Sequence, residues 1–147
     1  MTYKRSEILA NRQKWIDYLQ EPERKKTKNE LESFYDNEAR CCLGHAEFLF
    51  NSDRSCIEEM VYYGESEVNL SEETMNLLGM YYNEGEIFNS GHYPITSYLK
   101  YEDKQFRSLS ILNDCTDITP QEIGKLLQGM IDGGENTPFK PLTDYEE

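Results

Sequence analysis

The chain has 147 residues, which is the length of one ordinary domain. Apolar residues make up only 37% of it, but 11 Tyr, 6 Phe and 1 Trp supply the large buried areas that a core requires, so disorder throughout is not expected. The 28 Asp and Glu against 15 Lys and Arg give a net charge of −13, which disfavours direct binding to nucleic acids and to anionic membranes.

The charge is unevenly distributed. Residues 1–28 contain eight Lys and Arg and four Asp and Glu, a local charge of +4, so the rest of the chain carries −17. An acidic surface suits a basic partner, and it also keeps a small protein dispersed. The sequence contains no run of about 18 apolar residues and residues 1–19 lack the apolar centre of a secretory signal, so we expect no membrane association and a cytoplasmic location.

A helix, a connector and a hairpin are predicted first along the chain. Residues 3–20 carry apolar side chains at helical spacing and are predicted to form a helix, which Pro22 ends. The basic residues at 24–28 form a connector that we expect to be solvated, although its charge could also hold an anion. The turn-forming residues at 35–38 predict a hairpin within 29–41.

The middle of the chain is predicted to supply the centre of the core. Residues 43–50 are mostly apolar and are predicted to form a buried helix. Two strands are predicted at 57–63 and 65–70. Ser71 is then predicted to begin a short helix, with Gly79 as the residue that stops it.

A further hairpin is predicted at 80–88, and residues 89–105 are expected to be rich in loops. The clearest helix start of the chain follows, with Thr119 as the N-cap, Pro120 in the first helical position and Glu122 in the third. The apolar face of this last helix consists of Ile123, Leu126, Leu127, Met130 and Ile131.

The chain is predicted to close with a tail that contributes nothing to the core. Gly133 and Gly134 end the last helix, and residues 135–147 are predicted to be an acidic extended tail outside the core. Phe139 and Leu142 are its large apolar residues and could dock onto the domain.

The predicted architecture is a single α+β domain over residues 1–134. An antiparallel sheet is expected between an N-terminal helix, a central buried helix and a C-terminal amphipathic helix. No internal repeat is visible in the sequence.

Two short runs, Arg40–His45 and Leu112–Asp114, place polar or nucleophilic groups at the edge of apolar segments. A packed scaffold would hold a site at such an edge. Asn113 and Asp114 are predicted to form a turn before the last helix, because their side chains bond readily to nearby backbone N–H groups. Asp114 is also predicted to pair with Arg40. The candidate ligand- or partner-binding residues of the two runs are Arg40, Cys41, Cys42, His45, Asn113 and Asp114.

The adjacent cysteines allow a thiol-dependent enzyme, which would need a cysteine of lowered pKa. Cys42 lies near the start of the predicted helix 43–50 with Arg40 close by, but a small buried cysteine at such a junction is the commoner arrangement. We therefore predict that Cys41 and Cys42 are structural, and we assign no catalytic residue. The four cysteines lack the close spacing of a zinc site, so neither a metal nor another cofactor is expected.

These motifs, in this order, resemble a widespread group of small, uncharacterised phage proteins. The resemblance rests on Arg40-Cys41-Cys42-Leu43-Gly44, Leu70-Ser71-Glu72-Glu73 and Leu112-Asn113-Asp114, followed by a closing helix, and it covers residues 8–131. The acidic, Tyr-rich sequence and the Pro-Phe-Lys-Pro-Leu tail look like those of phages that infect cyanobacteria. The resemblance implies a phage origin and carries no reaction with it.

The expected function is binding rather than catalysis. A phage-encoded protein in the host cytoplasm could act on a host protein, or sequester a small nucleotide-like ligand used in host defence signalling. A protein partner is favoured because acidic residues are abundant and phosphate-binding groups are sparse. The chain is also compatible with a homodimer.

Two other functions stay open from the sequence. Residues 29–103 carry sixteen Asp and Glu against three Lys and Arg, which would permit an acidic nucleic-acid mimic. The second alternative is a thiol-dependent enzyme that uses the region of Cys41 and Cys42.

Overall fold

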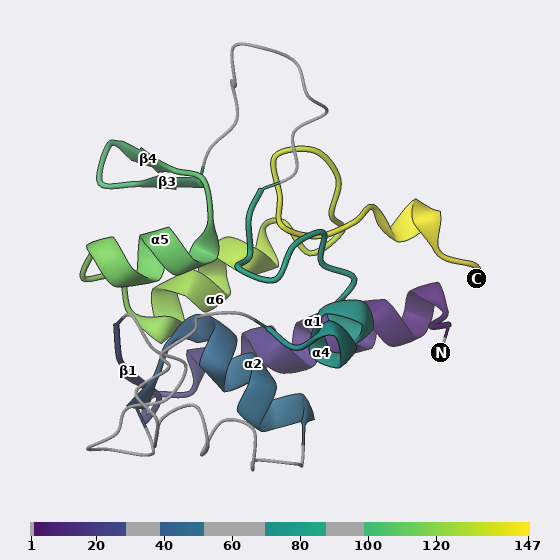
Figure 1. The fold of residues 1–147 in the computed structure, drawn as a ribbon, viewed down its shortest axis with the longest axis horizontal. Helices are drawn as coiled ribbons and strands as arrows, with labels where there is room; N and C mark the ends of the chain where they lie inside the picture. The colour runs from purple at the N-terminus through teal and green to yellow at the C-terminus, as the bar shows by residue number, and fades with distance from the viewer. Residues whose placement is uncertain (1, 29–38, 52–69, 88–98) are drawn as a thin grey trace.

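The fold consists mainly of helices, with a few short strands (Figure 1). It is given by a computed structural model that describes residues 2–28, 39–51, 70–87 and 99–147. The predicted α+β class is confirmed. The helices are α1 (Arg5–Gln20), α2 (Cys42–Phe50), α4 (Glu72–Leu78), α5 (Leu109–Cys115) and α6 (Pro120–Gln128), with a 3-10 turn η1 (Leu142–Asp144) near the C-terminus. The strands are β1 (Lys25–Lys26), β2 (Ala39–Arg40), β3 (Leu99–Tyr101) and β4 (Lys104–Phe106).

The described strands form two separate pairs rather than one antiparallel sheet. β1 and β2 pair in parallel, whereas β3 and β4 pair antiparallel. The predicted strands at 57–63 and 65–70 and most of the predicted hairpin at 29–41 lie outside the described residues. Short connections cannot join parallel strands, so the pairing of β1 with β2 is a contact that no local pattern specifies.

Two local predictions between residues 80 and 106 are wrong. The hairpin predicted at 80–88 does not form, because Met80 pairs with Phe139 and Glu86 pairs with Ser108. A tight hairpin forms instead within the predicted loop, where β3 and β4 are joined through Glu102 and Asp103 at positive φ. Apolar alternation indicates which residues of a segment are half-buried, but it does not say which strand they pair with.

The core is organised on one face of α1. Ile8, Trp15, Ile16 and Leu19 recur at helical spacing and are fully buried, as the sequence predicted. This face packs against α6, α4 and α2. Gly124 lets α6 approach closely, because a Cβ atom there would lie 3.1 Å from the main-chain oxygen of Ile16.

Arg12 lies on the same face and has no exposed surface, although nothing in its charge suggests a core residue. Burial lowers the pKa of its guanidinium to about 10, so it stays protonated at neutral pH. Its N–H groups donate only to main-chain oxygens in the contacts of the described chain: Leu78 at 2.8 Å, Gly79 at 3.2 Å, Ile131 at 2.8 Å and Lys140 at 2.8 Å. The cation therefore joins the ends of α4 and α6 to the C-terminal tail, and helix C-termini favour a positive charge.

The prediction that residues 135–147 lie outside the core is wrong at Phe139. This side chain is fully buried, and its ring packs edge-on against Trp15 with 6.2 Å between the ring centroids. The guanidinium of Arg12 lies 4.5 Å from the centroid of the same ring. A single Phe-Lys pair between two prolines resembles a loose peptide in the sequence, but here Phe139 fills a space beside a buried cation that the sequence did not predict.

Arg5 holds the end of the tail against the start of α1. Its guanidinium donates to the main-chain oxygens of Leu142 at 3.0 Å and Tyr145 at 3.2 Å, and it pairs with the carboxylate of Glu147 at 2.9 Å. The two ends of the chain consequently lie side by side (Figure 1).

Arg12→Met should lower the free energy of unfolding by at least about 3 kcal/mol, because the main-chain oxygens of Leu78, Ile131 and Lys140 lose the guanidinium as a donor, and Gly79 keeps only the N–H of Lys140. Arg5→Met is the matched control, since its side chain is 33% exposed, and it should cost about 1 kcal/mol. Urea denaturation of both variants measures the difference. A loss below 1 kcal/mol for Arg12→Met would contradict the role given to this cation.

Phe139→Ala should cost about 3–5 kcal/mol, as expected for a large cavity beside Trp15. Leu142→Ala is the control from the same tail, because Leu142 is only half-buried, and it should cost clearly less. Thermal unfolding followed by circular dichroism compares the two. Equal and small losses would show that the tail is dispensable for the core.

Candidate functional site

Both candidate runs contact the main chain of the basic segment 24–28, for which the sequence predicts a solvated connector. On one side, the Nε2 atom of His45 lies 2.7 Å from the main-chain oxygen of Lys25. On the other side, the amide of Asn113 donates to the main-chain oxygen of Thr27 at 2.9 Å. Of the candidate residues, His45, Asn113 and the main chain of Arg40 are therefore brought together through the main chain of segment 24–28.

Cys41 and Cys42 are both 1% exposed, which confirms the prediction that at least one of them is buried. Cys41 is the N-cap of α2, and its sulfur accepts the N–H of Gly44 at 3.2 Å. The sulfur of Cys42 lies 4.0 Å from the main-chain oxygen of Leu109 in α5. The thiols thus sit where α2 packs against α5.

Burial also determines the chemistry of these thiols. It raises the pKa of Cys41 to about 12 and raises the pKa of Cys42 well above its ordinary value. A thiolate is the reactive form of cysteine, so neither side chain supplies a nucleophile at neutral pH.

His45 is fully buried on the first turns of α2. Because Nε2 faces a carbonyl oxygen, that nitrogen carries the proton of the neutral ring. Burial is the main cause that lowers the pKa of His45 to about 4; the guanidinium groups of Arg40 and Arg24 act in the same direction, and the hydrogen bond to the Lys25 carbonyl opposes them. The ring is neutral near pH 7.

The turn predicted at Asn113 and Asp114 is wrong, because both residues belong to the last turn of α5. The hydroxyl of Ser108 accepts the N–H of Ile111 at 3.1 Å and starts the helix there. The N-cap serine followed by Leu109 and Leu112 is the signal for this helix in the sequence.

The predicted pairing of Arg40 with Asp114 stays a prediction. Arg40 is 5% exposed, and its guanidinium lies 3.8 Å from the centroid of the Phe48 ring. The carboxylate of Asp114 accepts the side-chain N–H of Asn113 at 3.0 Å.

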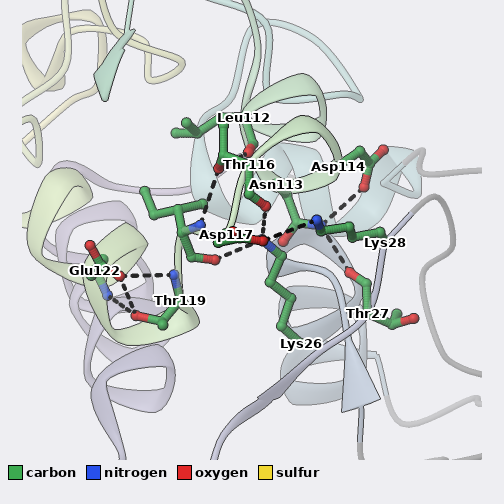
Figure 2. Close-up of polar contacts among 11 residues, drawn as sticks. Lys26, Thr27, Lys28, Leu112, Asn113, Asp114, Thr116, Asp117, Thr119 and Glu122 are labelled. Atoms are coloured by element: carbon green, nitrogen blue, oxygen red, sulfur yellow. Dashed lines mark hydrogen bonds and ion pairs between the residues drawn. The ribbon is translucent and has the colours of Figure 1, made fainter. Parts of the chain in front are cut away.

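Lys26 is a residue of this site that sequence reasoning missed. Its Nζ atom donates to the main-chain oxygens of Thr116 and Ile118, each at 2.7 Å (Figure 2). Burial, followed by the charge of Lys28, lowers the pKa of Lys26. Four basic residues in a five-residue segment look equivalent in a sequence, and only the strand geometry shows which one turns inward.

The loop that Lys26 contacts leads directly into the predicted start of α6. The Thr116 hydroxyl donates to the main-chain oxygen of Leu112 at 2.7 Å and fixes this loop. Thr119 and Glu122 then form a reciprocal capping box, in which the N–H of each residue is accepted by the side chain of the other. This prediction is confirmed.

Two adjoining hollows are lined by residues that precede α1, by residues of α4 and by residues of the C-terminal tail. Their volumes are about 260 Å³ and 250 Å³, and Tyr3 and Asn76 line both of them. Glu72 and Glu73 complete the first hollow, whereas the second is completed by Thr2, Lys140 and Tyr145. The sequence contained no signal for this arrangement, because it depends on how the tail packs.

No family model, curated protein or solved structure matches this chain. The resemblance to phage proteins accordingly stays a prediction. Within the described ranges, no three His, Cys, Asp or Glu residues gather as a metal ion would require. None of the described helices is long and apolar enough to cross a membrane.

Iodoacetamide at pH 7.4 should modify Cys115, which is exposed, and leave Cys41 and Cys42 unmodified in the folded protein. Peptide mass spectrometry reads each position separately, and labelling in 6 M urea shows that all of them can react. Modification of Cys41 or Cys42 in the folded state, at a rate like that of Cys115, would restore the thiol-enzyme hypothesis.

Proposed function

We propose that this chain is a non-catalytic binding protein whose partner is a protein with a basic surface. The observation that carries the proposal is the burial of Cys41 and Cys42, whose raised pKa values remove the nucleophile from the run that the sequence singled out. The other polar groups of the candidate site, His45 and Asn113, bond to the main chain of segment 24–28. These residues act as scaffold, so the partner is expected to contact other parts of the surface.

Carboxylates are the most numerous charged groups that are exposed on the described surface. Carboxylates complement a basic partner and speed its association at moderate salt. The exposed acidic residues include Glu7, Asp17, Glu72, Glu73, Glu102, Asp103, Glu122, Glu135, Asp144 and Glu146. They come from α1, α4, the β3–β4 hairpin, α6 and the tail, which lie on different sides of the molecule (Figure 1). A nucleic-acid mimic would need a row of carboxylates on one face, and this distribution does not favour it.

We place one contact with the partner at the first hollow. A lysine or arginine side chain could lie against the ring of Tyr3 and pair with Glu72 or Glu73. The same two carboxylates would repel the phosphates of a nucleotide-like ligand, so the protein partner is favoured over a sequestered small molecule.

The biological setting of the proposal comes from the resemblance to phage proteins. If the chain is a phage protein, its partner is a protein of the infected cell. The chain then acts in the host cytoplasm and affects host defence or regulation. The acidic composition supports this choice of partner without identifying it.

Glu72→Gln with Glu73→Gln should weaken partner binding at least about 10-fold, which corresponds to about 1.4 kcal/mol. The control pair is Glu102→Gln with Asp103→Asn, at the tip of the β3–β4 hairpin. Each pair removes two negative charges and changes the net charge from −13 to −11, so general electrostatics affect both equally. Asn tolerates the positive φ of residue 103, and the control pair should weaken binding by no more than about 2-fold.

The partner is first captured from a cyanobacterial host lysate at 150 mM salt and identified by mass spectrometry, and affinities are then measured with the purified protein by calorimetry. An unrelated protein of equal net charge controls for capture by charge alone. If the wild-type chain captures no protein beyond those captured by the control, the proposed function is wrong. A nucleotide-like molecule bound to the chain in native mass spectrometry would contradict it as well.

A further inference from the structure

The Nδ1 atom of His45 is the buried side-chain polar atom that lacks a hydrogen-bond partner in the part of the chain that the structure describes. The rest of the ring is well placed, since Nε2 lies 2.7 Å from the main-chain oxygen of Lys25 and the residue has no exposed surface. One side of the imidazole is thus satisfied by segment 24–28, and the other side has an unused lone pair.

The described charged groups around this ring are cations. Arg24 approaches from the chain that follows α1, and Arg40 approaches from β2. The ring of Tyr18 in α1 packs against His45, with 5.7 Å between the ring centroids, and Arg24 lies 3.4 Å above the same tyrosine ring. The carbonyl of Lys25 in β1 is the acceptor that faces the imidazole.

Protonation of His45 would therefore meet three unfavourable conditions at once. It would create a buried N–H at Nδ1 without an acceptor, place a charge away from water, and add that charge beside Arg24 and Arg40. The protonated ring is stable only if water reaches it. Segment 24–28 covers the Nε2 edge of the ring through Lys25, so movement of that segment away from α2 would open this edge to water.

We propose that segment 24–28 is released from α2 by acid, through protonation of His45, while the part of the fold built around Arg12 stays closed. The first half of this proposal rests on the short pairing between the segment and β2. Lys26 and Asn113 tie the segment to α5 and to the loop after it, so the side that is released is the one that faces β2 and α2. The pairing with β2 covers two residues, and Lys25 is already exposed. Such short, partly exposed pairing belongs to the parts of a protein that open with the least free energy.

The second half rests on the chemistry of the Arg12 contacts. Its acceptors are the main-chain oxygens of Leu78, Gly79, Ile131 and Lys140, and carbonyl groups do not titrate. The guanidinium keeps its charge at acidic pH. The hydrogen bonds that tie α1 to α4, to the turn after α6 and to the tail therefore involve no titrating acceptor, and Asp132 is the carboxylate whose charge acts on this guanidinium.

The pH window follows from the sign of the shift. The pKa of His45 is about 4 in the closed structure, against 6.5 for an ordinary histidine, so the open form binds the proton more readily. Opening is unaffected above about pH 6.5, becomes more favourable as the pH falls below that value, and levels off below about pH 4. The opening equilibrium should rise about 30-fold between pH 8 and pH 5 and about 300-fold in total.

Hydrogen exchange at pH 8 and pH 5, corrected for intrinsic rates, tests this directly. The N–H of Thr27, which donates to the main-chain oxygen of Arg40 at 3.2 Å, is the reporter for the segment. Its protection should fall about 30-fold, and the protection of amides within α1 and α6 should stay constant. Equal loss of protection in Thr27 and in α1 would show global acid unfolding and would overturn the proposal.

His45→Gln is the matched variant, because its amide can still donate to the Lys25 oxygen and cannot titrate in this range. The chain contains two histidines, and His92→Gln is the control. His45→Gln should abolish the pH dependence at Thr27, and His92→Gln should retain it. If His45→Gln does not fold, titration of the wild-type His45 ring by NMR decides: an ordinary value near 6.5 contradicts the proposal, and a value near 4 supports it.

Discussion

The fold depends on one buried cation that pairs with backbone dipoles rather than with a carboxylate. The guanidinium of Arg12 fixes the relative positions of α4, the turn after α6 and the tail, because it contacts the main-chain oxygens of Leu78, Ile131 and Lys140. Gly79 shows how tight this arrangement is. Its φ is +66°, and a Cβ atom there would lie 2.8 Å from the Arg12 guanidinium and would collide with the Tyr145 hydroxyl. Any other residue at position 79 would have to push the cation off its acceptors.

The same chemistry recurs wherever irregular chain is buried. Lys26 donates to the loop after α5, Asn113 donates to Thr27, and Trp15 donates to the main-chain oxygen of Cys42 at 3.1 Å. Described strands of two or three residues satisfy few carbonyl groups, and buried carbonyl groups need donors. Long polar side chains supply those donors here, and they perform the task that a larger sheet performs in other α+β domains.

This explains which features could be predicted from the sequence. Helix α1, the start of α2 and the capping box at Thr119 follow from periodicity and local capping, and the sequence predicted all three. The exchange of partners at Met80 and the burial of Phe139 depend on contacts between distant segments, so local patterns missed them. Arg12 did leave a signal, since it stands four residues after Ile8 on the apolar face, but a charge on that face is normally read as an interruption.

The candidate residues show the same limit. The structure brings His45 and Asn113 to the main chain of segment 24–28, which is a contact between distant segments, and it places Asn113 and Asp114 in α5 rather than in the predicted turn. Their role was harder to predict, because it depends on direction. A histidine or asparagine that faces a main-chain oxygen holds the scaffold, whereas the same residue facing solvent would be available to a ligand.

Because several basic side chains bond to carbonyl groups inside the fold, the charge at the molecular surface differs from the charge of the whole sequence. Residues 1–28 carry the basic excess of the sequence, yet Arg12 is fully buried and Lys26 is directed at carbonyl groups. Arg5 and Arg24 are likewise engaged with carbonyl and carboxylate groups of the described chain. Cations that bond inward in this way contribute less to the surface charge than their number suggests, while most of the described carboxylates are exposed. Glu47 is buried, and the N–H of Ser71 compensates its carboxylate. The surface is accordingly more acidic than the composition alone implies, and a basic partner is the complement that such a surface selects.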